Sequence, residues 1–204
     1  MQSTAGAQLN FSLDAPLAAQ LKTLAQGQGV TLFMLLLASF QTLLHRYSGQ
    51  GDVRVGVPIA NRNRSETEPL IGFFVNTQVL KAELDSQTRV GELLQQVKRH
   101  ALEAQAHQDL PFEQLVEALQ PERDLSRSPL FQVMYNLQSE AAQLVPQLAG
   151  LQLEAVPSEK HTAQFDLMLH TVESSDGLSA SLTYATALFE AATIERMAAH
   201  WQQL

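Results

Sequence analysis

The sequence contains no cysteine among its 204 residues, and this absence excludes several kinds of site. Without thiols the chain can form no disulfide, no thiolate metal centre and no cysteine nucleophile. The same absence is consistent with a cytoplasmic protein, which is the location we expect. Six histidines are present, but none has an HxH or HExxH spacing, so we predict no metal site.

Long basic and long apolar runs are also missing. Lysine and arginine number 13 against 21 acidic residues, which gives a formal net charge of -8, and no basic cluster is present to bind nucleic acid. The longest apolar run covers residues 32–38 and is too short to span a bilayer, so we expect no membrane partner. The first ten residues form no secretory signal, and no dinucleotide-binding, P-loop or nucleophile-elbow motif occurs.

The residues that are present predict an α/β protein with a mixed sheet. Hydrophobic residues make up 45% of the chain, enough for a core. Period-two and helical patterns interleave along the chain, and the Asp176-Gly177 pair predicts an antiparallel hairpin. Strands are expected at about 9–13, 53–59, 72–84, 130–137, 151–156, 164–172 and 178–185, and helices at about 14–27, 31–47, 90–105, 111–120 and 190–204. Asp14, Thr31 and Thr88 are the predicted N-caps of three of these helices.

The two ends have the pattern of a fragment. The chain closes at Leu204 inside a helical pattern with no glycine, asparagine or proline to stop it. We therefore interpret the last helix as truncated, and Met1 as a residue that need not be the native start.

Three segments in fixed order carry a resemblance to a known family. They are IGFFVNTQ (Ile71–Gln78), HQDLPFEQL (His107–Leu115) and RDLSRSPLFQV (Arg123–Val133). Together they resemble the second half of the condensation domain of nonribosomal peptide synthetases. Flanking stretches extend the resemblance over about 8–204, among them VRVGVPIANRNR and FDLMLH.

The resemblance implies a lobe with the chloramphenicol acetyltransferase fold, in which residues 1–204 form the C-terminal half of a condensation domain. The family places its catalytic histidine in an HHxxxDG motif of the first half, and no adjacent histidine pair occurs in this chain. The N-terminal half with that motif is thus absent. We expect no catalytic residue in this fragment, and no more than trace activity from it alone.

The implied reaction is amide bond formation between a carrier-tethered aminoacyl or peptidyl thioester and an acceptor amine. The phosphopantetheine arms of the carrier proteins would be substrates, with no cofactor bound directly. The expected partners are the N-terminal lobe of the same domain and the donor and acceptor peptidyl carrier proteins. This lobe would supply one wall of the substrate tunnel and a docking surface, and the segment Ser139–Gly150 would cross over to the other lobe.

Two alternatives remain. The chain could be a non-catalytic module that binds carrier proteins or a partner lobe. It could also be a standalone acetyltransferase of the same fold, which ranks last because no histidine is followed by aspartate at the HxxxD spacing.

Asn76 is the first candidate for the tunnel wall. Strand alternation would place it on the same face as Phe74, near the histidine of the other lobe. The competing interpretation is an asparagine that satisfies neighbouring backbone groups, because a buried amide needs hydrogen bonds. Gly72 would let the backbone pass a tight spot.

The second segment suggests a structural role rather than acid-base chemistry. His107 and Asp109 at i and i+2 point to different sides of a helix. We expect Asp109 to cap the short helix that Pro111 opens, and Phe112 to anchor in the core.

The third segment supplies further candidates. Gln132 and Ser126 are predicted to face the tunnel. Arg127 would pair with acidic residues or a carrier phosphate, unless it belongs to a solvated loop. Asp166, a lone carboxylate in an apolar strand, needs a partner and suits a structural role.

Overall fold

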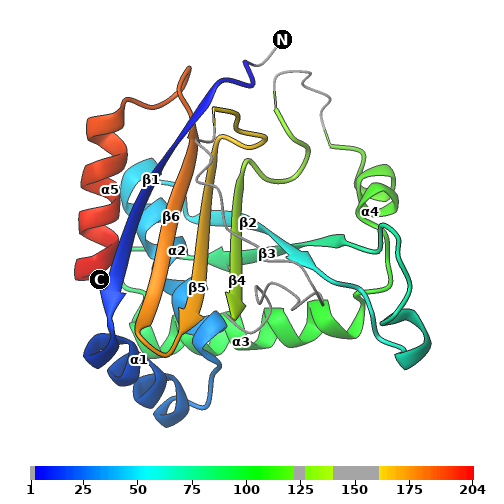
Figure 1. Cartoon of the computed structure of the whole chain (residues 1–204), viewed down its shortest axis with the longest axis horizontal. Helices are drawn as coiled ribbons and strands as arrows, with labels where there is room; N and C mark the ends of the chain where they lie inside the picture. Colours follow the sequence, from blue (N-terminus) through cyan, green and yellow to red (C-terminus); the bar gives the residue numbers. More distant parts are fainter. Residues whose placement is uncertain (1–2, 122–126, 140–160) are drawn as a thin grey trace, which may run out of the picture.

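A six-stranded mixed sheet with helices along one face organises the chain (Figure 1). The computed structural model describes residues 3–121, 127–139 and 161–204. The strands are β1 (Gly6–Asp14), β2 (Asp52–Ile59), β3 (Asn76–Glu83), β4 (Val133–Ser139), β5 (Leu167–Ser174) and β6 (Gly177–Ala185). The helices are α1 (Ala15–Gly27), α2 (Leu32–Ser48), α3 (Val90–Ala106), α4 (Phe112–Leu119) and α5 (Ala191–Gln203), with a 3₁₀ turn at Ser65–Thr67. The predicted α/β class with a mixed sheet is confirmed.

Strand order is β1-β6-β5-β4-β2-β3. β4 runs parallel to both β2 and β5, and the other neighbours are antiparallel. The Asp176-Gly177 turn joins β5 to β6 as predicted, and Gly177 has a φ of +130° that a side chain would strain.

Helix α2 is the centre of the core. Its apolar residues cover most of its circumference, which predicts burial, and both Leu37 and Phe40 are 0% exposed. The Thr31 hydroxyl accepts a hydrogen bond from the Met34 amide at its start. Gly49 ends the helix in a left-handed conformation.

Across the described ranges, no single helix combines the length and apolar character that crossing a bilayer requires. Helices α1 and α2 meet that criterion only as a pair, with a bend of 101° between them.

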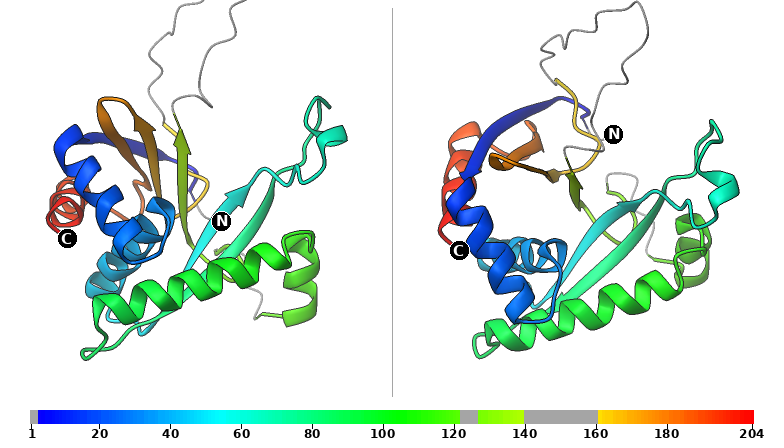
Figure 2. Two further views of the ribbon diagram at one scale, coloured as in Figure 1. Left: turned by 90° about the horizontal axis from the view of Figure 1, so that it is seen from below. Right: turned by 60° about the horizontal axis from the view of Figure 1, so that its bottom comes forward.

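The sheet divides between β2 and β4. Within the described residues these two strands pair at a single position, Gly56 with Met134, whereas β4 and β5 pair over the whole of β4. The β2–β3 hairpin consequently runs across the direction of the other strands in Figure 1 and projects from them in Figure 2.

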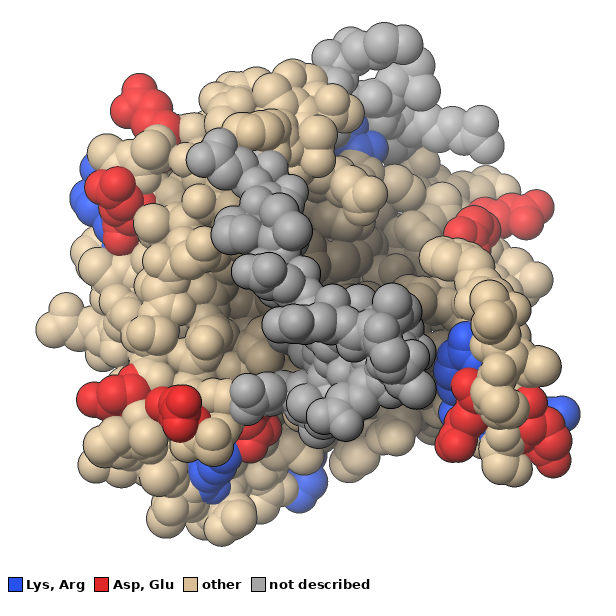
Figure 3. Space-filling view, in the orientation of Figure 1, with Lys and Arg blue, Asp and Glu red and all other residues tan. Residues whose placement is uncertain are grey.

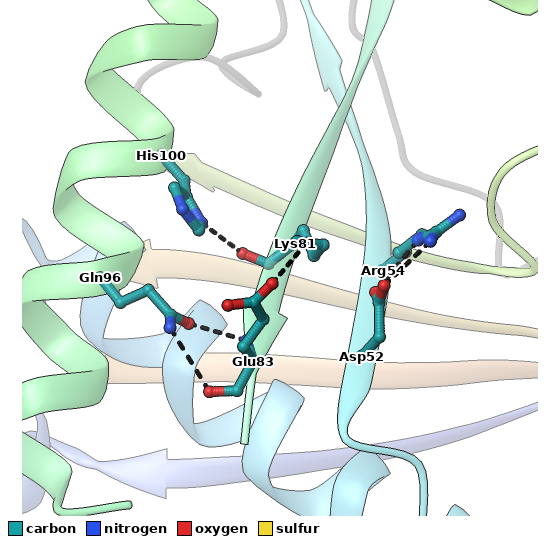
Figure 4. Close-up of polar contacts among 6 residues, drawn as sticks. All are labelled: Asp52, Arg54, Lys81, Glu83, Gln96 and His100. Atoms are coloured by element: carbon teal, nitrogen blue, oxygen red, sulfur yellow. Dashed lines mark hydrogen bonds and ion pairs between the residues drawn. The ribbon is translucent and has the colours of Figure 1, made fainter. Parts of the chain in front are cut away.

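Helix α3 covers the edge of the sheet at β3. The Gln96 side chain accepts a hydrogen bond from the Glu83 amide (2.8 Å) and donates to the Glu83 carbonyl (3.4 Å), and His100 Nδ1 donates to the Lys81 carbonyl (2.7 Å) (Figure 4). These bonds satisfy backbone groups that an edge strand would otherwise offer to another chain.

Several predicted boundaries are wrong, among them the start of β5, which is Leu167 rather than residue 164, and the start of β1, which is Gly6 rather than residue 9. β3 begins at Asn76, so residues 72–75 precede the strand and Phe74 does not alternate with Asn76 in it. Helix α3 has Arg89 as its N-cap, because the Thr88 hydroxyl is engaged with Asp85 in the preceding turn.

β4 begins at Val133 rather than Leu130. Leu130 has a φ of 68°, and the Phe131 amide donates to the Pro129 carbonyl, which makes a tight three-residue turn before the strand. The predicted strand at 151–156, and residues 140–150 of the predicted crossover, lie outside the described residues.

Candidate functional site

Asn76 joins the first family-like segment to the second. Its Nδ2 donates to the carbonyls of Gln108 (3.0 Å) and Leu110 (2.8 Å). Its Oδ1 accepts from the amides of Phe112 (3.0 Å) and Thr77 (2.9 Å). An asparagine amide has two donors and one acceptor oxygen with two lone pairs, so these four bonds use all of its capacity. In the structure Asn76 therefore satisfies backbone groups of the α3–α4 connection, and its place in a tunnel wall stays a prediction.

The predicted capping role of Asp109 is wrong. The amide of Phe112, at the start of α4, bonds to Asn76 instead. Asp109 Oδ1 accepts a hydrogen bond from Asn63 Nδ2 (3.1 Å), which ties the α3–α4 connection to the loop of the β2–β3 hairpin. Pro111 does precede the first helical residue, as expected.

An aromatic cluster joins the second segment to the third. The Phe131 ring centroid lies 5.5 Å from that of Phe112 and 5.5 Å from that of Phe165. Phe131 is 3% exposed. Phe112 is half-buried and packs here rather than in the core under the helices, which corrects the predicted anchor.

Gly56 of β2 lies against the same cluster. A Cβ atom on Gly56 would lie 2.3 Å from Cε2 of Phe131, well inside contact distance. Sequence reasoning did not single out Gly56 or Phe165. The usable signal was a glycine between Val55 and Val57, because glycine inside a strand often marks a close approach.

The loop of the β2–β3 hairpin carries exposed apolar side chains. Ile71 is 105% exposed and Phe73 is 91% exposed. The Arg62 guanidinium lies 4.2 Å from the Phe74 ring centroid, a cation–π contact. A Cβ on Gly72 would lie 3.1 Å from Cε2 of Phe74, so the backbone does pass close to a side chain at Gly72.

A cavity of about 800 Å³ opens where the sheet divides. Gln132 and Asp166 line it, together with Arg54 at the start of β2 and Phe189 before α5. Gln132 Nε2 donates to the Ser128 carbonyl (3.0 Å). On the face drawn in Figure 3, the Lys, Arg, Asp and Glu side chains lie mainly at the periphery. The wall thus combines apolar side chains with amide, hydroxyl, carboxylate and guanidinium groups.

Arg54 and Asp52, which both line the cavity, form an ion pair with each other. Nε and Nη2 of Arg54 donate to the two carboxylate oxygens of Asp52 at 3.0 and 2.9 Å. These hydrogen bonds lower the pKa of Asp52 from its usual value. Arg127, within the third segment, is exposed, and Ser126 lies outside the described residues.

Metal chemistry has no support in the described ranges. No group of three or more histidine, aspartate or glutamate side chains there is arranged to hold a metal ion.

Comparison with known proteins settles the family. Residues 1–204 match the family described as Condensation domain. The chain belongs to the condensation-domain family. This condensation-domain chain is 52% identical over 206 residues to one of the linear gramicidin synthase proteins of Brevibacillus parabrevis, with 100% of the chain and 3% of that protein covered. It is 45% identical over 195 residues to malpinin synthetase of Mortierella alpina, with 96% of the chain and 2% of that protein covered. The chain therefore spans a very small part of these relatives.

Solved structures agree with this assignment. The X-domain from teicoplanin biosynthesis has a TM-score of 0.92 at 26% identity, covering 99% of this chain and 46% of that one. The four-domain nonribosomal peptide synthetase holo-AB3403 has a TM-score of 0.85 at 27% identity, covering 99% of this chain and 16% of that one. The predicted chloramphenicol acetyltransferase-like condensation fold is confirmed.

Proposed function

We propose that this condensation-domain chain takes part in forming amide bonds between a carrier-tethered aminoacyl or peptidyl thioester and an acceptor amine. The observation that carries the proposal is the 52% identity over the entire chain to a linear gramicidin synthase. The non-catalytic binding module is not favoured, because the relatives that match the whole chain are peptide synthases.

Within that reaction the chain would act as the C-terminal lobe. Two observations support this: it covers 46% of the length of the teicoplanin X-domain chain, and it lacks the HHxxxDG motif. The catalytic histidine would come from the N-terminal lobe. The residues of this chain would form a wall of the tunnel and part of the carrier docking surface.

This reaction depends mainly on the positioning of the acceptor amine and the thioester. The acceptor amine attacks the thioester carbonyl, the tetrahedral intermediate collapses, and the phosphopantetheine thiolate leaves and gains a proton. Holding both arms in line and stabilising the oxyanion supply most of the rate, with general-base help from the histidine of the other lobe. The arms are substrates in this scheme, and donor and acceptor carrier proteins are the partners.

The described residues fit such a supporting role. Asn76 holds the α3–α4 connection through four hydrogen bonds, and Gln132 and Asp166 border the cavity at the division of the sheet. A tunnel-facing role for Asn76, Phe74, Gln132 and Ser126 remains part of the proposal.

A chimera tests the proposal directly. In the linear gramicidin synthase protein that is 52% identical, the matching segment of a condensation domain is replaced by these 204 residues. Product formation on loaded carrier proteins is followed by mass spectrometry. The control replaces the same segment with that of a second linear gramicidin synthase protein, which is 50% identical to this chain. We expect both chimeras to form product, and an active control beside a folded but inactive test chimera would refute the proposed function.

A further inference from the structure

We propose that Gly56 and Phe131 form a steric stop that sets the angle at which the β2–β3 hairpin leaves the sheet. The position of the hairpin tip, defined as residues 60–75, would then depend on the contact between Gly56 and Phe131. The proposed function is needed only for the expected effect on amide formation, whereas the stop itself is a property of this chain.

The contact at Gly56 is unusually close. A Cβ built there would lie 2.3, 2.6 and 2.7 Å from three carbons of the Phe131 ring. Val55 and Val57 belong to the core cluster that contains the buried side chains of α2 and α3, so by alternation the ring lies on the opposite face of β2. The ring therefore rests on the backbone of β2 at the position where only hydrogen can fit.

The same position is where β2 meets β4. Gly56 pairs with Met134, and no second pair joins these strands in the part of the chain that the structure describes. One pairing leaves the crossing angle of two strands poorly determined, because a ladder of several hydrogen bonds is what normally aligns them. The Phe131 ring, packed against Gly56 beside that pairing, supplies a second constraint on the crossing angle of β2 and β4.

Phe131 is itself held from several directions. Phe112 and Phe165 each lie 5.5 Å away between ring centroids, and the ring is almost fully buried. Its backbone follows Leu130, whose positive φ belongs to a strained turn. Strain of this kind persists only where the surroundings impose it, and here it directs the Phe131 side chain onto Gly56.

The consequence reaches the apolar hairpin tip. Ile71 and Phe73 lie in the tip, 15 and 17 residues after Gly56, and their side chains are exposed to solvent. Only residues 57–59 of β2 separate Gly56 from the tip, so a rotation of the backbone at Gly56 changes the direction in which the tip projects. Gly56 is thus a positioning residue that acts through Phe131 on the surface presented by the tip.

A distance measurement on the full chain tests this. The protein has no native cysteine, so cysteines placed at the exposed positions Glu66, in the tip, and Glu195, on α5, can carry two spin labels without background. Gly56→Ala is expected to change the mean label distance. The matched control is Gly91→Ala, because a Cβ at Gly91 meets nothing within 4 Å.

Rescue separates positioning from general damage. Phe131→Leu removes the ring, so the Gly56→Ala/Phe131→Leu double variant should lose the shift of the single alanine variant. Phe131→Leu alone should broaden the distance distribution, because the stop is gone. This variant also tests the proposal if Gly56→Ala fails to fold. An unchanged distribution in Phe131→Leu, or an unshifted distance in folded Gly56→Ala, would overturn the stop.

Activity adds a second, separable readout. In the gramicidin synthase chimera, Gly56→Ala is expected to reduce product formation at least tenfold, and Gly91→Ala to leave it unchanged. An inactive parent chimera would count against the proposed function, while the label distances would still decide the stop.

Discussion

Replacement of Asn76 by alanine gives the sharpest test of how the family-like segments are held together. The side chain makes three hydrogen bonds to residues far along the chain, at Gln108, Leu110 and Phe112, besides the local one to Thr77. Alanine removes all of them and leaves two carbonyls and an amide of the α3–α4 connection without this partner.

The expected loss follows from those three bonds. Each intramolecular hydrogen bond contributes about 0.5–1.5 kcal/mol net. Because Asn76 is half-buried and water can replace part of the interaction, we take the lower half of that range and expect a loss of about 2 kcal/mol in the free energy of unfolding. For a chain of this size that corresponds to a fall in Tm of about 6 °C.

Chemical denaturation followed by circular dichroism measures the loss, and hydrogen exchange at the Phe112 amide locates it. Asn10→Ala is the matched control, because Asn10 is exposed on β1 and its side chain accepts its hydrogen bond from Gln8, two residues away. Asn76→Asp keeps the acceptor but sets a negative charge against two carbonyls, so it should be no more stable than the alanine variant at neutral pH. An Asn76→Ala loss below about 0.5 kcal/mol, equal to that of the Asn10 control, would refute the reasoning.

Three further outcomes are expected. Phe40→Ala should lower the free energy of unfolding by about 3–5 kcal/mol in denaturant titration, because the ring is fully buried in the core. Gln41→Met should change the free energy of unfolding by less than about 1 kcal/mol in the same assay, because two effects oppose each other. The substitution loses the hydrogen bond from Nε2 to the Leu80 carbonyl, but it also removes the buried Oε1, which has no partner in the described structure. Asp52→Asn should cost less than about 1 kcal/mol at neutral pH, since the pair is exposed. Arg54 lowers the folded-state pKa of Asp52 below its unfolded value near 3.8, so the stabilisation exists above that pH and is lost as pH falls through the folded-state pKa. Denaturation curves at pH 7 and pH 2.5 should show the difference between wild type and Asp52→Asn shrinking, and a difference that grows in acid would contradict this.

Local chemistry made several elements predictable. Asp14 and Thr31 begin helices because their side-chain oxygens accept backbone amides three residues on, at Leu17 and Met34. Alternating valines predicted β2, and the Asp176-Gly177 pair predicted the β5–β6 hairpin. These signals arise within a few residues, so they can be read without the fold.

Other boundaries depended on distant partners. Asn76, not the start of the FFVN run, begins β3, since the strand can extend only as far as its pairing with Ile59. Asp109 was the obvious cap for α4 by position, yet Asn76 takes that amide from another strand. When a side chain from a distant part of the sequence takes the amide that a local cap would bind, the residues around the helix start give no sign of it.

The sequence by itself determined the class of fold, most of the helices and strands, and, through three ordered segments, the condensation-domain family. The tertiary structure alone decided that these segments meet, through the amide of Asn76 and the rings of Phe112 and Phe131. It also decided that a side chain at Gly56 would collide with a ring where the sheet divides. The physical reason is that periodicity and capping report on neighbours along the chain. Hydrogen-bond competition and ring packing depend on which distant atoms share the same space.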